Sequence, residues 1–263
     1  MAIERGVVLA DLRAESAELE HIVAGLDPAG WARDTPAAGW TVAHQIAHLA
    51  WTEEKLVMAV TDPPAFAAEL RMLATEPGSY VDDGAAAGAK EPPERILERW
   101  RGTRAAVQQV LAEAPEQKVV WYGPAMLPTS LATARIMETW AHGQDVADAL
   151  GITRPPTARL RHVAHLGYRA RDFAYSVRGL TPPAEAFRVE LTGPDGDTWA
   201  FGPADAAQRV TGPALDFCQL TTQRRHRADL ALVATGPDAE QWLEIAQSFA
   251  GPSGEGRAPG QFG

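Results

Sequence analysis

Apolar positions recur every three to four residues through much of the first half of the chain, which is the period of an amphipathic helix. Asp27-Pro28 and Gly30 break the first such segment. The second begins at Trp40-Thr41, where Thr41 is a suitable N-cap. The pattern predicts long helices over residues 3–26, 40–62, 94–114 and 129–150, and a shorter helix over 65–74. Four long helices separated by breaks are typical of a helical bundle.

Two stretches between these helices lack the helical period. Residues 75–92 are rich in Gly, Ala and Asp, and we expect a mobile loop there. Residues 115–128 are expected to form a second loop, which contains Trp121 and Tyr122. The last long helix should end at Gly151, a natural C-cap, because Pro155-Pro156 cannot continue it.

The pattern changes after Pro155-Pro156. FRVELT alternates like a strand, PDGD is a hairpin-turn sequence, and TWAFG can be the return strand. Another candidate strand is ADLALVAT, and the chain ends in an irregular tail, GPSGEGRAPGQFG. Further helices are predicted near residues 157–178, 213–222 and 238–250. We therefore predict a mainly α fold, with a four-helix bundle over residues 1–154 and a smaller α+β domain over 155–263.

Two of the predicted helices carry chemically active side chains on one face. At about 100° per residue, His44, His48 and Trp51 fall together on the second long helix, opposite its apolar stripe. That stripe comprises Val42, Ile46, Leu49, Val57 and Val60. On the helix over 129–150, the same arithmetic places on one face the residues Arg135, Glu138, His142 and Asp145.

Glu138 and His142 are one helical turn apart, so a carboxylate and an imidazole can converge on one point. Such a pair is a reasonable half-site for a divalent ion, and a histidine from a neighbouring helix would give three protein ligands and an open position. The alternative is a simple ion pair between Glu138 and His142. Periodicity alone does not show that the two helices face each other.

Composition and charge narrow the class of protein. Hydrophobic residues make up 46% and charged residues 22%, which is enough to build a core. The net charge of -10 disfavours nucleic acid as a partner. Cys218 is the only cysteine, which fits a reducing compartment. We expect a cytoplasmic protein, because the first twenty residues carry charges throughout, unlike a secretory signal, and no apolar run is long enough to span a membrane.

Four segments resemble a known family. GWTVAHQIAHLAW resembles the start of the second helix of DinB-like metal-binding four-helix bundles. ARIMETWAHGQDVADALG resembles a later helix of the mycothiol-dependent maleylpyruvate isomerase branch, which has a Glu-x-x-x-His-x-x-Asp core. TGPALDFCQLTTQRR and AQSFAGPSGEGR are similar to the C-terminal region of an actinobacterial metal-binding subfamily of that branch.

The resemblance implies a DinB-like bundle and a metal site. The first ligand of the family falls on His48, its carboxylate on Glu138 and its second histidine on His142. Zinc is the ion that this donor set favours, and nickel, iron or manganese would also be tolerated. We expect His44 to be a substrate contact or a partner of a ligand, and Asp145 to accept a hydrogen bond from a ligand histidine.

The function that the resemblance favours is a metal-dependent transferase or isomerase that uses mycothiol as a co-substrate. The small-molecule substrate would be electrophilic, and Arg135 or Arg224 could hold its carboxylate. One alternative is a thiol-independent metal-dependent lyase, cyclase or hydrolase, and another is a non-enzymatic metal- or ligand-binding protein. A homodimer is compatible with the sequence.

The remaining candidates have ordinary structural explanations. Cys218 could be a nucleophile, but a single cysteine in a helix is more often a small buried hydrophobe. The basic run over 224–227 could bind an anion or be a solvated helix end. His162 and His165 are expected to be structural or exposed. Trp121 and Tyr122 could line a pocket or seal the end of the bundle.

Overall fold

The computed structural model describes residues 4–75, 79–254 and 256–262, which fall into two compact units that divide between Arg154 and Pro155. The predicted start of the first helix at Ile3 and parts of the predicted loop over 75–92 and of the C-terminal tail lie outside the described residues. Within the described ranges, no helix is both long enough and apolar enough to cross a membrane.

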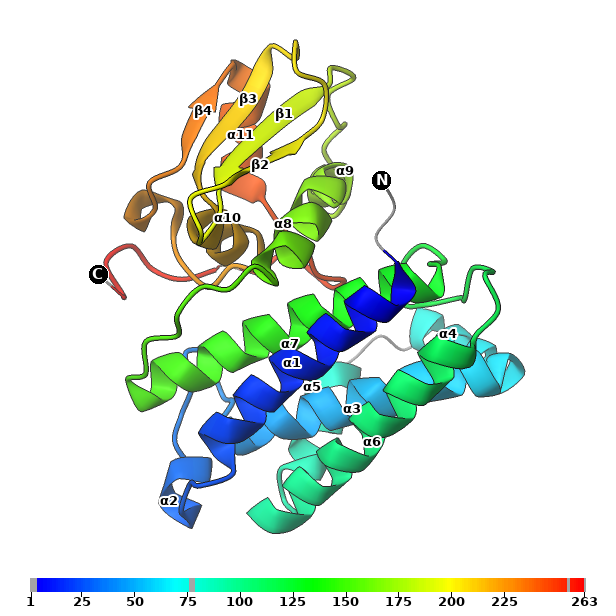
Figure 1. The fold of residues 1–263 in the computed structure, drawn as a ribbon. Coiled ribbons are helices and arrows are strands. Elements are labelled where there is room, and N and C mark those ends of the chain that lie inside the picture. Colours follow the sequence, from blue (N-terminus) through cyan, green and yellow to red (C-terminus); the bar gives the residue numbers. More distant parts are fainter. Residues whose placement is uncertain (1–3, 76–78, 255, 263) are drawn as a thin grey trace. The chain divides into compact units, whose positions relative to one another are not determined.

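Four long helices form the main body of the N-terminal unit (Figure 1). They are α1 (Arg5–Val23), α3 (Val42–Thr61), α6 (Pro93–Glu113) and α7 (Pro128–Leu150). Helix α3 packs against α6 and α7, and α1 packs against α7 and α6. The core between them is apolar and includes Leu19, Ile46, Leu49, Ile96, Trp100 and Val146. This arrangement confirms the predicted four-helix bundle.

The ends of the long helices follow local sequence signals. Thr41 is the N-cap of α3, and its side chain and backbone nitrogen both contact His44 Nδ1, at 2.9 and 3.3 Å. Gly151 ends α7 in the left-handed conformation, with φ of 67°. Arg154, just beyond, is bound by the buried carboxylate of Glu15 at 2.5 Å and by Glu18 at 2.9 Å, which ties the end of α7 to α1.

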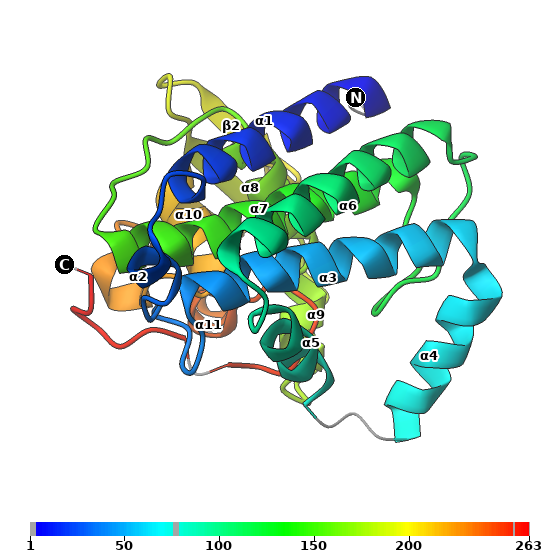
Figure 2. The same cartoon turned by 90° about the horizontal axis from the view of Figure 1, so that it is seen from below.

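The prediction of a loop over residues 75–92 is wrong for most of that stretch. Helix α5 (Tyr80–Gly88) lies there and runs beside α3 (Figure 2). A Cβ atom on Gly84 would come within 2.6 Å of the Trp51 ring, and one on Gly88 within 2.9 Å of the Ala47 Cβ. The glycines therefore let the two helices approach closely, and tertiary packing overrides the low helix propensity that predicted a loop.

Two further short helices complete this unit. Helix α2 (Pro28–Trp31) follows the predicted break at Asp27-Pro28, and Asp27 caps it by accepting a hydrogen bond from the Gly30 backbone nitrogen at 2.7 Å. Helix α4 (Pro63–Thr75) is the predicted short helix.

The C-terminal unit is a small sheet with helices, as predicted. Strands β1 (Phe187–Thr192) and β2 (Thr198–Phe201) form the predicted antiparallel hairpin. Strand β3 (Gln208–Pro213), which the pattern did not reveal, pairs with β1 in parallel, and β4 (Val233–Thr235) pairs with β3 antiparallel. The sheet order is β2-β1-β3-β4. The helical elements are α8 (Leu160–Arg169), α9 (Arg171–Ser176), α10 (Ala214–Thr221), η1 (Arg227–Asp229) and α11 (Pro237–Ile245).

Three predicted elements of this unit differ in extent from expectation. The predicted helix over 157–178 is divided at Ala170 into α8 and α9, and the predicted helix over 238–250 ends at Ile245. The predicted strand ADLALVAT is a strand only in its last three residues, because Arg227–Asp229 form a turn of 3₁₀-helix ahead of it.

Candidate metal centre

Helices α3 and α7 bring three ligand-type side chains together. His48 lies on α3, and Glu138 and His142 lie one turn apart on α7. The Oε2 atom of Glu138 is 3.3 Å from His142 Nε2 and 4.0 Å from His48 Nε2. One donor atom from each residue lies within 4.8 Å of the other two. We refer to these three residues as the ligand cluster.

The spacing and chemistry of the ligand cluster fit a divalent ion. In a tetrahedral zinc site with bonds of about 2.1 Å, neighbouring donors are about 3.4 Å apart. The 3.3 Å separation between Glu138 and His142 matches that spacing, and the 4.0 Å separation to His48 needs only a small side-chain movement. The side chains of Glu138 and His142 keep 18% and 11% exposure, so the cluster is not completely enclosed.

The neighbours of Glu138 hold it in its ionised form. Burial would raise the pKa of this carboxyl, but the His142 ring and the positive charge of Arg135 outweigh burial and lower the pKa to about 2. Glu138 therefore carries a negative charge at neutral pH, as a metal ligand must.

Arg135 faces the ligand cluster from within the bundle. Its Nη2 atom is 3.9 Å from Glu138 Oε1, and its Nη1 atom donates a hydrogen bond to Thr52 Oγ1 at 2.9 Å. The residue is 4% exposed, and its guanidinium lies 5.7 Å from the centre of the Trp121 ring. These contacts suit a residue that orients Glu138. The predicted contact between Arg135 and a substrate carboxylate stays a prediction.

The second ring nitrogen of His142 contacts a residue that the sequence reasoning missed. His142 Nδ1 lies 2.5 Å from Oε1 of Gln45, which is fully buried on α3. Gln45 thus lies beside this ring nitrogen, and the predicted hydrogen bond between Asp145 and a ligand histidine stays a prediction. Asp145 is itself fully buried on α7. Gln45 had a detectable signal, because it is a polar residue one helical turn before His48 and directly precedes the apolar Ile46.

An indole ring packs against the ligand cluster. The Trp40 ring centre is 5.1 Å from that of His48 and 6.0 Å from that of His142, and Trp40 Nε1 donates a hydrogen bond to Asp82 on α5 at 3.0 Å. The ring of His44 lies 6.3 Å from Trp40, and its Nδ1 atom is used in capping α3. Partial burial lowers the pKa of His44. His44 is therefore a capping residue close to the cluster, and its predicted contact with substrate stays untested.

The aromatic residues of the 115–128 segment pack at one end of the bundle. The Trp121 ring stacks on Phe66 of α4 with a centre distance of 5.4 Å. The Tyr122 hydroxyl is 3.3 Å from both the Tyr80 hydroxyl and Glu69 Oε1. Trp121 also contacts the Arg135 guanidinium, so the two predicted alternatives, lining a pocket and sealing the end of the bundle, both stay predictions.

The other sequence candidates lie in the C-terminal unit. Cys218 is fully buried, and burial raises the pKa of its thiol well above the usual range, which opposes a role as nucleophile. His162 is buried on α8, and His165 packs against Phe201 with its pKa lowered by burial and by nearby positive charge. The basic run over 224–227 follows α10 and enters η1.

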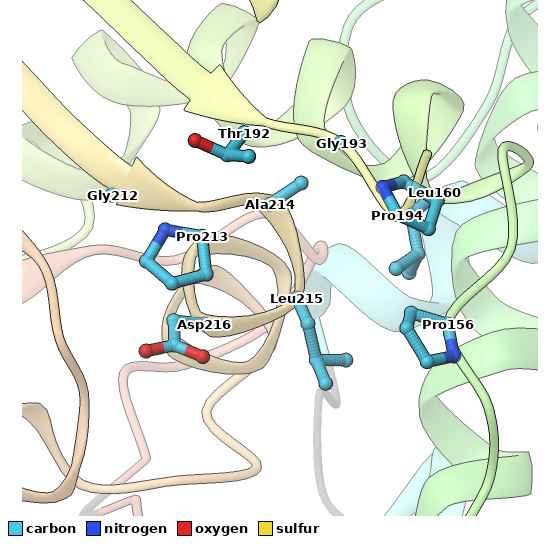
Figure 3. Close-up of a pocket in the computed structure, with 10 residues that line it drawn as sticks. All are labelled: Pro156, Leu160, Thr192, Gly193, Pro194, Gly212, Pro213, Ala214, Leu215 and Asp216. Atoms are coloured by element: carbon cyan, nitrogen blue, oxygen red, sulfur yellow. The ribbon is translucent and has the colours of Figure 1, made fainter. Parts of the chain in front are cut away.

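The C-terminal unit also contains a cavity of about 450 Å³ (Figure 3). Proline, glycine and aliphatic side chains form most of its wall, at the ends of β1 and β3 and the start of α10. Asp216 is its one acidic residue, and the Asp216 carboxylate accepts a hydrogen bond from the Ala231 backbone nitrogen at 2.7 Å. This cavity offers no constellation that resembles the ligand cluster.

The fold and the ligand cluster define a class of protein, a four-helix bundle with two histidines and one glutamate between two helices, followed by a small α+β unit. The family model described as mycothiol maleylpyruvate isomerase N-terminal domain matches residues 12–147, a span that contains the whole ligand cluster. The chain belongs to this family, which confirms the resemblance seen in the sequence. A second model, described as wyosine base formation, matches residues 183–235, from just before β1 to the end of β4.

Relatives and solved structures agree with this assignment. Two uncharacterized proteins from two strains of Mycobacterium tuberculosis are each 55% identical over 253 residues, covering 96% of this chain and 98% of the relative. A crystal structure of a mycothiol-dependent maleylpyruvate isomerase matches with a TM-score of 0.58 and 18% identity, over 84% of this chain and 90% of that chain. A crystal structure of a histidine-to-alanine mutant of a mycothiol-dependent maleylpyruvate isomerase matches with a TM-score of 0.59 and 17% identity. This match covers 88% of this chain and 93% of that chain. At these identities the likeness shows the fold.

Proposed function

We propose that this protein is a metal-dependent enzyme that uses a low-molecular-weight thiol, mycothiol, to isomerise or conjugate a small electrophilic metabolite. The observation that carries the proposal is the ligand cluster of His48, Glu138 and His142 in a chain of the mycothiol maleylpyruvate isomerase family. The partial exposure of Glu138 and His142 supports an open coordination position, which distinguishes catalytic from structural sites.

The residues of the chain have separable roles in this proposal. His48, Glu138 and His142 would hold the ion, and zinc suits two neutral imidazoles and one carboxylate. A bound divalent ion would lower the pKa of a coordinated thiol and make thiolate available at neutral pH. Arg135 would keep Glu138 ionised and oriented. Reversible addition of a thiolate to an activated double bond permits rotation and isomerisation, whereas addition without elimination gives a conjugate.

A thiol-independent reaction at the same cluster is the principal rival. A lyase, cyclase or hydrolase would use the ion as a Lewis acid or to activate water, and would need the same three ligands. A non-enzymatic binding protein would be expected to have a closed site, which the exposed edges of Glu138 and His142 disfavour.

Thiol coordination is the step that separates these functions. In protein loaded with cobalt(II), addition of mycothiol is expected to produce a thiolate-to-metal charge-transfer band. The band should titrate with an apparent pKa well below the ~8.5 of a free thiol. An unchanged cobalt spectrum at saturating mycothiol, or full turnover of a substrate without any thiol, would contradict the proposal and favour the thiol-independent rival.

A further inference from the structure

A chain of hydrogen bonds leads from the backbone before α3 to the ligand His142. Thr35 Oγ1 donates a hydrogen bond to the Trp40 carbonyl oxygen at 2.7 Å. Gln45 Nε2 lies 2.9 Å from Thr35 Oγ1, and Gln45 Oε1 lies 2.5 Å from His142 Nδ1. We call Trp40, Thr35 and Gln45 the relay.

One polarity of the relay keeps all three of its hydrogen bonds. A backbone carbonyl can only accept, so the Thr35 hydroxyl hydrogen is used on Trp40. The Thr35 oxygen must then accept from Gln45, and only the amide nitrogen of Gln45 can donate. The amide oxygen of Gln45 is thereby turned toward His142 Nδ1, which must donate to it.

We infer that Gln45, oriented by Thr35, is a positioning residue that holds the Nδ1–H group of His142 and so reserves Nε2 for an ion. Nε2 lies 3.3 Å from Glu138 Oε2, and any proton that Nε2 shares with this carboxylate would be released when the ion binds. A ring without a proton on Nδ1 would leave the Gln45 amide oxygen without its donor. This inference rests on the proposed metal site for its purpose, but the hydrogen bond between Gln45 and His142 is present in the metal-free chain.

Burial gives the relay its strength. Gln45 is fully buried, so water cannot replace a partner that its amide loses. If the Gln45 amide turned over, its NH₂ group would face His142 and its oxygen would face Thr35. The Thr35 hydroxyl would then have to leave the Trp40 carbonyl, which also accepts a hydrogen bond from the Thr35 backbone nitrogen at 2.8 Å. The Thr35 hydroxyl therefore favours the orientation in which the Gln45 amide oxygen faces His142 Nδ1.

The Nδ1–H group can be measured without any metal. In chelator-treated protein, ¹H–¹⁵N NMR of the His142 ring is expected to show an Nδ1–H proton that exchanges slowly with water, because it is hydrogen-bonded to Gln45. Thr35→Ser keeps the hydroxyl and should preserve this slow exchange, whereas Thr35→Val and Gln45→Leu should speed the exchange. A wild-type ring without a slowly exchanging Nδ1–H, or no change in both Thr35→Val and Gln45→Leu, overturns the inference.

Metal affinity provides a second readout. Loss of a ligand's hydrogen-bond partner typically lowers metal affinity about 10–100-fold, so Thr35→Val and Gln45→Leu should weaken zinc binding at least about 10-fold. Thr35→Ser should bind like the wild type, as should Thr61→Val, a matched control on α3 whose hydroxyl bonds only to the Val57 carbonyl among the described contacts. Equal zinc affinity for Thr35→Val and Thr35→Ser would overturn the positioning role.

The two measurements separate this inference from the proposed function. A wild type that shows the slowly exchanging Nδ1–H but binds no divalent ion supports the role of Gln45 and contradicts the metal-dependent enzyme. A wild type that binds zinc tightly but shows no slowly exchanging Nδ1–H on His142 when metal-free contradicts the relay and leaves the proposed function standing.

Discussion

Glu138→Gln is expected to lower zinc affinity by at least about 100-fold. This loss exceeds the roughly 10–100-fold loss of metal affinity that typically follows when the hydrogen-bond partner of a ligand is removed. The substitution keeps the shape of the side chain but removes the only carboxylate of the ligand cluster. The positive charges of the ion and of the buried Arg135 would then both lack the negative charge of Glu138 that balances them. Chelator competition, with elemental analysis of protein purified without affinity-tag metal, measures the effect. The wild type should contain about one divalent ion per chain.

The control for this loss is an exposed glutamate in the same bundle. Glu98→Gln on α6 changes a surface pair with Arg95 and should leave zinc affinity unchanged. His48→Ala and His142→Ala should resemble Glu138→Gln, with far-UV circular dichroism confirming that each variant stays folded. Wild-type affinity in Glu138→Gln would show that Glu138 is not a ligand.

The ligand cluster could be predicted because its members carry local signals. Glu138 and His142 are separated by one turn of a strongly periodic helix, and His48 lies on the polar side of another. Periodicity fixes which residues share a face of one helix, but not which helices pack together. The family resemblance supplied that pairing, and the structure shows the 3.3 and 4.0 Å separations that result.

The partners of the ligands were harder to predict because they depend on tertiary contacts. Helical spacing placed Asp145 one turn beyond His142, yet Gln45 from the opposite helix contacts His142 Nδ1. Thr35 enters from a segment without a helical period, so sequence spacing carries no information about its distance from the site. Helix α5 was missed for a related reason, because Gly84 and Gly88 weaken the local signal while allowing close packing on α3.

Glu53 is the buried acid whose ionisation should dominate a pH effect on stability. It lies on α3 with 2% exposure and accepts a hydrogen bond from Thr103 Oγ1 at 2.8 Å. Burial raises its pKa from 4.5 to about 8, although Thr103 and the charge of Arg135 oppose the change. Between these two pH values the folded chain keeps a proton that the unfolded chain has released. The free energy of unfolding therefore falls as pH rises through this window.

Glu53→Gln cannot ionise, so it should remove this pH dependence in metal-free protein. The stability of the variant relative to the wild type is expected to rise between pH 5 and pH 8, by up to about 1.4 kcal/mol per pH unit. Urea unfolding at several pH values in this range, with chelator present, measures the difference. Glu98→Gln, which is exposed, should instead run parallel to the wild type. Parallel profiles for Glu53→Gln and the wild type would show that Glu53 is already ionised in the folded protein at pH 5.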